Sequence, residues 1–162
     1  MNGLQSNLQS NVSGMSVDAI LARLFITCLK IEERVISEES GGTLSISELH
    51  VLREIGLGAD RAMSQVAHGL KISVSALTIA MNKLEKKGYV VRERSNEDRR
   101  IVRLHLTDKG IEAYKLHTDF HTGMVNSALA GLSAEERTVL NKSLAQLESY
   151  FYEEWERVCG DK

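Results

Sequence analysis

The sequence contains no proline, only two cysteines and few aromatic residues. Without proline, helices can run long without forced kinks, which favours a mostly helical chain. Cys28 and Cys159 are far apart and form no Cys-x-x-Cys pair, so neither a disulfide framework nor a thiolate zinc ribbon is supported, and a reducing cytoplasm is the expected setting. An aromatic content of 5% disfavours a sheet sandwich and a stacking platform for single-stranded nucleic acid.

Long apolar runs and catalytic motifs are missing as well. No run reaches the roughly 18 to 20 residues of a membrane helix, and the stretch MNGLQSNLQSNVSG lacks the basic and apolar regions of a signal peptide. We therefore expect a cytoplasmic protein without membrane contact. GLGADR at 56–61 lacks the third glycine of a dinucleotide loop, and no phosphate-binding loop, GxSxG or HExxH is present. The sequence predicts that the chain is not an enzyme.

The 162 residues suffice for one soluble domain with a hydrophobic core. Residues 1–15 have no apolar period and are expected to form a disordered tail. Apolar residues at intervals of three and four predict a long helix within 16–40, and a similar stripe predicts helices within 108–160. These stripes exceed what one small core needs, so they indicate dimerisation helices; packing onto the rest of the same chain is the alternative.

Residues 45–107 show the order of elements of a winged helix-turn-helix. Ser45 and Glu48 form a capping box for a short helix, and a second short helix leads to Ser73, the N-cap of a helix that reaches about Lys87. Two extended runs, 89–94 and 100–106, then flank a charged tip and predict a β-hairpin. The predicted fold is mainly α with a small β-hairpin: a winged helix-turn-helix domain plus terminal dimerisation helices.

Positive charge is concentrated in that segment. Residues 83–109 carry nine Lys and Arg against five Asp and Glu, whereas the rest of the chain has an acidic excess. Clustered cations attract DNA phosphates, although a solvated charged face gives the same pattern. The exposed helix suits the major groove of double-stranded DNA, with Asn82 pairing with adenine and Ile79 touching a thymine methyl. The predicted helix contacts are Ser73, Ser75, Ala76, Thr78, Ile79, Asn82 and Lys83.

The hairpin tip adds a second set of predicted DNA contacts: Arg94, Asp98, Arg99 and Arg100. An arginine at such a tip can enter the narrow minor groove, where the negative potential is enhanced, and a neighbouring carboxylate can hold its guanidinium ready for insertion. The alternative is a surface Asp–Arg pair that contributes under about 1 kcal/mol.

The stretch SQVAHGLKISVSALTIAMNKLEKKGYVVRERSNEDRRIVRLHLTDKG resembles the MarR family of bacterial transcriptional regulators, and the likeness extends from residue 17 to about 158. It implies an obligate homodimer that binds a pseudo-palindromic operator, with Arg100 in the minor groove and Asp98 as its support. ISELH at 46–50 and YKLHTDFHTGMVNSALAGLSAEE resemble the subgroup that represses fatty-acid synthesis genes, which implies long-chain acyl-acyl-carrier protein as corepressor.

The histidines suggest a further ligand. His117 and His121 lie four residues apart on a predicted helix, a spacing that suits a shared metal. Resemblance to zinc-sensing MarR proteins adds His50 and either Glu32 or Glu33 as counterparts. The same residues could instead line a ligand pocket, or be buried histidines hydrogen-bonded to a carboxylate. From the sequence no cofactor is certain: the acylated carrier protein and zinc both remain open, with zinc the less favoured.

Overall fold

The computed structural model describes residues 14–39, 42–58, 60–95 and 97–160. The tail predicted over 1–15 therefore lies almost wholly outside the described residues, as does Asn96 in the predicted hairpin tip. The chain divides into two compact units, Met1–Thr118 and Asp119–Lys162. Among the described residues, no helix combines the length and the apolar character that crossing a bilayer requires.

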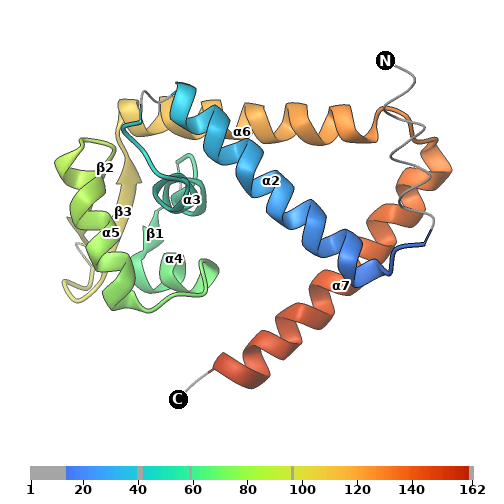
Figure 1. Ribbon diagram of the computed structural model, residues 1–162. Coiled ribbons are helices and arrows are strands. Elements are labelled where there is room, and N and C mark those ends of the chain that lie inside the picture. Colours follow the sequence, from blue (N-terminus) through green and yellow to red (C-terminus); the bar gives the residue numbers. More distant parts are fainter. Residues whose placement is uncertain (1–13, 40–41, 59, 96, 161–162) are drawn as a thin grey trace. The chain divides into compact units, whose positions relative to one another are not determined.

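The elements follow one another in the predicted order (Figure 1). They are α2 (Val17–Glu39), α3 (Ile46–Ile55), β1 (Arg61–Ala62), α4 (Met63–Gly69), α5 (Val74–Lys86), β2 (Val90–Arg94), β3 (Val102–Leu106), α6 (Asp108–Leu129) and α7 (Ala134–Cys159). The predicted fold class, mainly helical with a winged helix-turn-helix, is confirmed.

Local capping explains where the helices begin. Ser45 Oγ accepts a hydrogen bond from the Glu48 amide at 3.3 Å, and Glu48 Oε2 accepts one from the Ser45 amide at 2.8 Å, which completes the predicted capping box of α3. Ser73 Oγ accepts from the Ala76 amide at 3.1 Å and starts α5 as predicted. Ser133 and Glu136 form a second capping box, at the start of α7.

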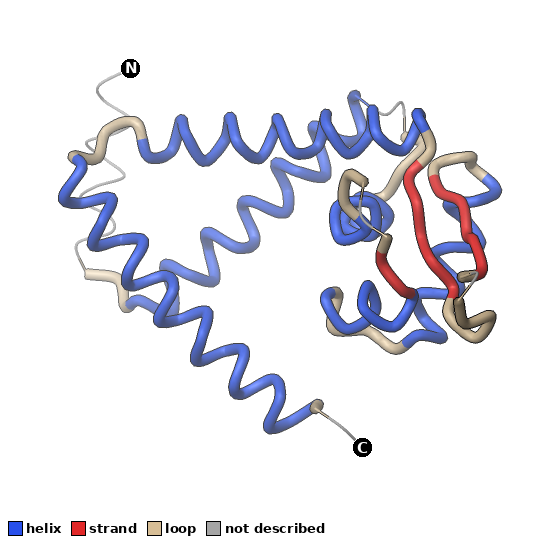
Figure 2. The backbone as a smooth tube through the Cα atoms, turned by 180° about the vertical axis from the view of Figure 1, so that it is seen from behind, coloured by secondary structure: helices blue, strands red, loops and turns tan. Residues whose placement is uncertain are grey.

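The sheet contains one strand more than the sequence predicted. Its antiparallel order is β1-β3-β2, so the predicted hairpin gains a third strand on the outer side of β3 (Figure 2). Arg61 pairs with Leu104, and Val90 with Leu106. The predicted hairpin is present as β2 and β3, whereas β1 was not predicted because it is only two residues long. Such a segment has no periodicity of its own and becomes a strand only by pairing with β3.

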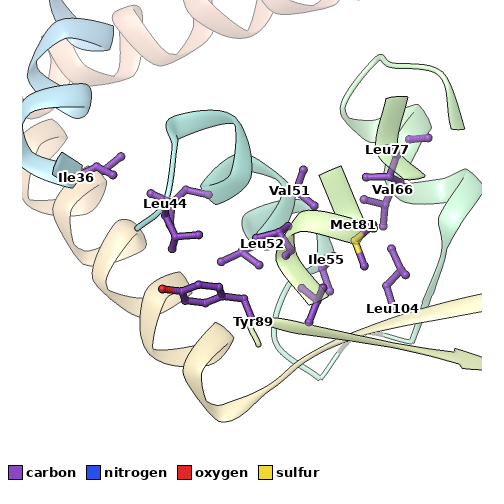
Figure 3. Packing of buried hydrophobic residues seen from close by; sticks show 14 residues of the cluster. Ile36, Leu44, Val51, Leu52, Ile55, Val66, Leu77, Met81, Tyr89 and Leu104 are labelled. Atoms are coloured by element: carbon purple, nitrogen blue, oxygen red, sulfur yellow. The ribbon is translucent and has the colours of Figure 1, made fainter. Parts of the chain in front are cut away.

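The hydrophobic core fills the space between α3, α4, α5 and the sheet (Figure 3). Leu77, Met81 and Leu84, which share one face of α5, are fully buried, as is Leu104 in the central strand. Burying each such side chain contributes about 1.5 to 3 kcal/mol, so these contacts fix the orientation of α5 about its own axis. The residues of α5 that were predicted to contact DNA consequently face away from the core.

Hydrogen bonds hold the residues before β2 against the start of α6. The Thr107 amide donates to the carbonyl oxygen of Tyr89 at 3.1 Å, and Thr107 Oγ1 donates to the carbonyl oxygen of Gly88 at 2.7 Å. The same hydroxyl oxygen accepts from the Gly110 amide at 3.1 Å and so caps α6. Gly110 is buried against Tyr89, and this contact seats the first turn of α6 on the winged helix.

Candidate nucleic-acid interface

Helix α5 presents its predicted contact residues as one outward face. Ser73, Ser75, Ala76, Asn82 and Lys83 are exposed, Ile79 is 61% exposed, and Thr78 is half-buried. Two of their oxygens already have roles inside the protein. Thr78 Oγ1 donates to the Val74 carbonyl at 2.8 Å, and Ser73 Oγ accepts the capping bond. The Ser73 hydroxyl accepts in this bond, so its proton can still be donated, whereas the Thr78 hydroxyl donates its proton within the helix.

The wing connecting β2 and β3 is held by its own backbone. Ser95 donates its amide to the Ile101 carbonyl, and Ile101 donates to the Asp98 carbonyl, both at 2.9 Å. Asp98 Oδ1 accepts from the backbone amide of Arg100 at 2.9 Å. The predicted link between the Asp98 carboxylate and the Arg100 guanidinium is not among the ion pairs of the described residues. Asp98 therefore orients Arg100 through its main chain, and the guanidinium extends into solvent.

A groove of about 600 Å³ is lined by residues of α5, of the wing and of the start of α4. Three arginines line it, Arg92, Arg100 and Arg103, together with Ser64, Gln65 and Thr78. Arg92 is paired with Glu85 and Arg103 with Asp60, so the charge that this groove offers to a phosphate backbone comes mainly from Arg100. Gln65 Oε1 accepts from the Ala62 amide at 2.9 Å, so this side chain also fixes the start of α4.

Arg92, Ser64 and Gln65 line this groove but were not among the contact residues predicted from the sequence. Arg92 is in β2, and its guanidinium donates to the side chains of Asn82 and Glu85 on α5. The alternation of side chains along β2 is a weak indication that Arg92 faces the protein, because Arg92 and the buried Val90 point to the same face of the strand. Its partner could not be read from the sequence, since Asn82 is ten residues earlier and on another element.

The end of α5 is tied to the start of α3 by an ion pair. Lys87 Nζ donates to Glu48 Oε1 and Oε2 at 2.7 and 2.8 Å, and the Glu48 side chain is only 9% exposed. Burial raises the pKa of Glu48. The hydrogen bond and charge of Lys87, together with the bonds from Ser45, more than offset this and hold that pKa below its ordinary value. Glu48 therefore stays ionised and anchors the helix that carries the contact residues.

A second polar cluster joins α2, α3 and α6 inside the first unit. Glu32 Oε1 lies 2.7 Å from Nε2 of His117 and 3.2 Å from Nε2 of His50. Glu32 and His117 are 3% exposed, and the two imidazole rings meet edge-on with centroids 5.7 Å apart. One ligand atom from each residue lies within 4.8 Å of the other two. These three residues, the Glu32–His50–His117 triad, were all candidate ligands in the sequence.

The remaining two candidates lie elsewhere. Glu33 is exposed and lines a different groove of about 600 Å³, formed between the end of α2 and the start of α3. The lining of this α2–α3 groove is mixed. Four of its side chains are apolar, Leu29, Ile36, Leu44 and Ile46, and four are polar or charged, Lys30, Glu33, Ser45 and Ser47. His121, one turn after His117 on α6, belongs to the second unit, and its ring packs edge-on against Phe120.

Comparison with known proteins assigns this architecture to a family. The sequence model of the MarR family matches residues 43–101. The HTH-type transcriptional regulator PecS of Dickeya dadantii (strain 3937) is 28% identical over 140 residues, which cover 86% of this chain and 84% of PecS. The crystal structure of Streptococcus pneumoniae FabT in complex with DNA is similar with a TM-score of 0.80 and 37% identity, covering 85% of this chain and 96% of FabT. This chain belongs to the MarR family.

Membership of the MarR family settles the general role of the chain. An uncharacterized HTH-type transcriptional regulator of Bacillus subtilis (strain 168), YkoM, is 28% identical over 140 residues and is matched over 89% of its length. These relatives are transcriptional regulators and not enzymes, as the sequence predicted. The chain is accordingly a MarR-type DNA-binding transcriptional regulator, and its winged helix-turn-helix is the DNA-binding element.

Proposed function

We propose that two copies of this chain form a repressor that binds a pseudo-palindromic operator. Each copy inserts α5 into a major groove and the wing arginine, Arg100, into the adjacent minor groove. The observation that carries the proposal is the groove between an exposed polar helix and an exposed wing, with Arg100 in its lining. An α-helix fits the major groove of B-DNA, and arginine suits the narrow minor groove.

The dimer is proposed from apolar side chains that the single chain leaves in solvent. In α7, which is described throughout, no side chain is buried, and Val139, Phe151 and Val158 are 60 to 65% exposed. On α2, Val17 and Phe25 are each 68% exposed. Large apolar side chains left exposed along each of these helices favour an interaction surface. A two-fold partner also supplies the second recognition helix, about 34 Å from the first, that a palindromic operator requires.

Replacing Arg100 tests the wing. Arg100→Ala should weaken binding to a selected operator duplex by about 1 to 3 kcal/mol, roughly 5- to 150-fold, because a minor-groove contact is lost. Arg34→Ala is the matched control, since it removes the same charge from α2, where the side chain is 80% exposed. Fluorescence anisotropy titrations of both variants at one salt concentration give the comparison. Equal affinities for Arg100→Ala and the wild type would remove Arg100 from the proposed contact.

For the ligand, we propose long-chain acyl-acyl-carrier protein acting as corepressor at fatty-acid synthesis promoters. The similarity to FabT supports this proposal, as does the α2–α3 groove. Its volume falls in the range of ligand sites, and its four apolar side chains offer contact to an acyl chain beside polar groups. The groove joins a proposed dimerisation helix to the DNA-binding lobe, so a ligand that prefers one arrangement of these elements would shift DNA affinity.

The carrier experiment uses a labelled promoter fragment of fatty-acid synthesis genes, in the presence of a chelator. Anisotropy is measured with long-chain acyl-acyl-carrier protein and with the unacylated carrier as control. Tighter DNA binding with the acylated form alone supports the corepressor proposal. Equal binding with both forms contradicts it and leaves the operator-binding proposal intact.

The Glu32–His50–His117 triad favours a second candidate, a zinc-responsive regulator. Two imidazole nitrogens and one carboxylate oxygen are the donor set of many zinc sites with an open position. The donor atoms fit this group, because all three converge from different helices inside the first unit. When bound, the ion would act as a cross-link between α2, α3 and α6. Without metal, the same atoms form a hydrogen-bonded cluster in which the Glu32 carboxylate accepts from both imidazoles.

Two neighbouring glutamates provide the matched test of this candidate. Glu32→Gln removes the buried carboxylate, whereas Glu33→Gln makes the same chemical change on the exposed neighbour. Zinc content is measured on protein purified without a histidine tag and dialysed against a defined zinc buffer. Zinc retained by the wild type and Glu33→Gln and lost by Glu32→Gln supports the site. A zinc-free wild type contradicts it.

A further inference from the structure

A polar contact of three side chains joins strand β2 to helix α5. Nη2 of Arg92 donates to Asn82 Oδ1 and to Glu85 Oε2, and Nε of Arg92 donates to the same Glu85 oxygen at 2.9 Å. The Arg92 side chain is 24% exposed and lines the groove between α5 and the wing. Although it stands in the basic groove, this guanidinium is therefore engaged mainly with the protein.

The contact determines which end of the Asn82 amide faces DNA. A guanidinium has donors and no acceptor, so the amide atom that meets it must be the carbonyl oxygen. The exposed end of Asn82 is then its NH₂ group. A bidentate pair with adenine needs the amide oxygen and nitrogen side by side at the base edge. With the oxygen turned toward Arg92, Asn82 offers a donor to purine N7, guanine O6 or thymine O4.

The charge of Arg92 is also engaged within the protein. Glu85 accepts two hydrogen bonds from it and neutralises it within the protein, so Arg92 adds little to the attraction for phosphates. Arg94, two residues further along the same strand, is exposed and has the profile of a phosphate-binding cation. The two arginines of β2 therefore differ in what they do, even though they lie on the same face of the strand.

We propose that Arg92 is a specificity-determining positioning residue: it holds the Asn82 amide so that Asn82 reads a hydrogen-bond acceptor on a base edge. This inference rests on the proposed function, in which α5 enters the major groove. Arg92 acts on the base sequence that is recognised, through Asn82, rather than on the strength of attraction to DNA in general.

The experiment begins with the full-length wild type and a pool of duplexes with a randomised centre. Selection gives the operator and the base preference at each position. Asn82→Ala then identifies the base pair whose preference is lost. Arg92→Ala should lose the preference at that same base pair and weaken operator binding by roughly 3- to 10-fold, less than a full bidentate contact. Its affinity for random-sequence duplex and its salt dependence should match those of the wild type.

Two further variants make the result specific. Arg94→Ala removes the same charge from the same strand and should weaken operator and random duplex alike, lowering the salt slope by about 1. Asn82→Asp keeps an oxygen for Arg92 and turns a second oxygen outward, so the preference should move to a base with a donor, cytosine or adenine. The double variant of Arg92 and Asn82 should bind the operator no more weakly than Asn82→Ala alone.

Several outcomes would overturn the inference. One is an Arg92→Ala protein that loses operator and random-sequence affinity by the same factor with a smaller salt slope, which is the signature of a phosphate contact. Another is an unchanged base preference in Arg92→Ala or in Asn82→Ala. A wild type that selects no sequence from the pool would overturn the proposed function itself, and this is seen before any variant is made.

Discussion

Gly110 is the residue whose replacement gives the sharpest test of how α6 is seated on the winged helix. It is the third residue of α6, and its amide donates to the capping oxygen of Thr107. A Cβ built at this position would overlap the backbone carbonyl oxygen of Tyr89, and it would lie 3.1 Å from that carbonyl carbon and 3.3 Å from Leu106 Cβ. The obstacle is main chain at the start of β2, so no side-chain rotation can relieve it.

Two opposing effects set the expected magnitude for Gly110→Ala. Alanine is favoured over glycine inside a helix by up to about 1 kcal/mol. Forcing a methyl group into a closely packed site costs about 1 to 3 kcal/mol. We expect the collision to dominate and the folded state to lose roughly 1 to 2 kcal/mol. For a chain of this size, that loss corresponds to a fall in Tm of about 2 to 8 °C.

Gly123→Ala is the matched control, because Gly123 lies in the same helix with nothing within 4 Å of its added Cβ. This variant should gain about 0.5 to 1 kcal/mol from helix propensity alone. Thermal unfolding followed by circular dichroism, at one protein concentration for all samples, measures the two shifts in Tm. A Gly110→Ala protein stabilised as much as Gly123→Ala would refute the close approach of α6 to Tyr89.

Two further predictions concern the helix that carries the contact residues. Glu48 has a folded-state pKa below its unfolded value, so its contribution to stability is complete above about pH 4.5 and is lost as the pH falls through the lower folded pKa. Glu48→Gln should cost about 1 kcal/mol at pH 7, because half-exposed Lys87 loses its partner, and urea unfolding should show the difference shrinking below that pH. Lys83→Ala should lower the slope of log affinity against log salt by about 1 if Lys83 meets a phosphate, and an unchanged slope would remove that contact.

Features fixed by contacts between near neighbours in the chain were predictable. The capping boxes of Ser45 with Glu48 and of Ser133 with Glu136 depend on residues three apart in the sequence, and both form in the structure. The inner stripe of α5 follows from helical periodicity, because Leu77, Met81 and Leu84 recur on one face of the helix. The same periodicity places Ile79 and Asn82 outside this buried stripe, where both are exposed.

Contacts between distant segments could not be read in this way. Glu32 and Glu33 are equivalent in the sequence, and the choice between them depends on the rotation of α2 against α3 and α6, which buries Glu32 beside His50 and His117. The strand β1 exists only because β3 pairs with it. The Asp98 carboxylate meets the backbone of Arg100 because the wing turn brings that amide within 2.9 Å.

By itself, the sequence determined the helices, their caps, the winged helix-turn-helix order and the basic segment, because propensity, periodicity and charge act over a few residues. Only the tertiary structure decided which side chains share a site. Arg92 meets Asn82 across the gap between β2 and α5, and the Glu32–His50–His117 triad draws on three helices. Packing of the core fixes the rotation and distance of each element, and no local rule specifies those two quantities.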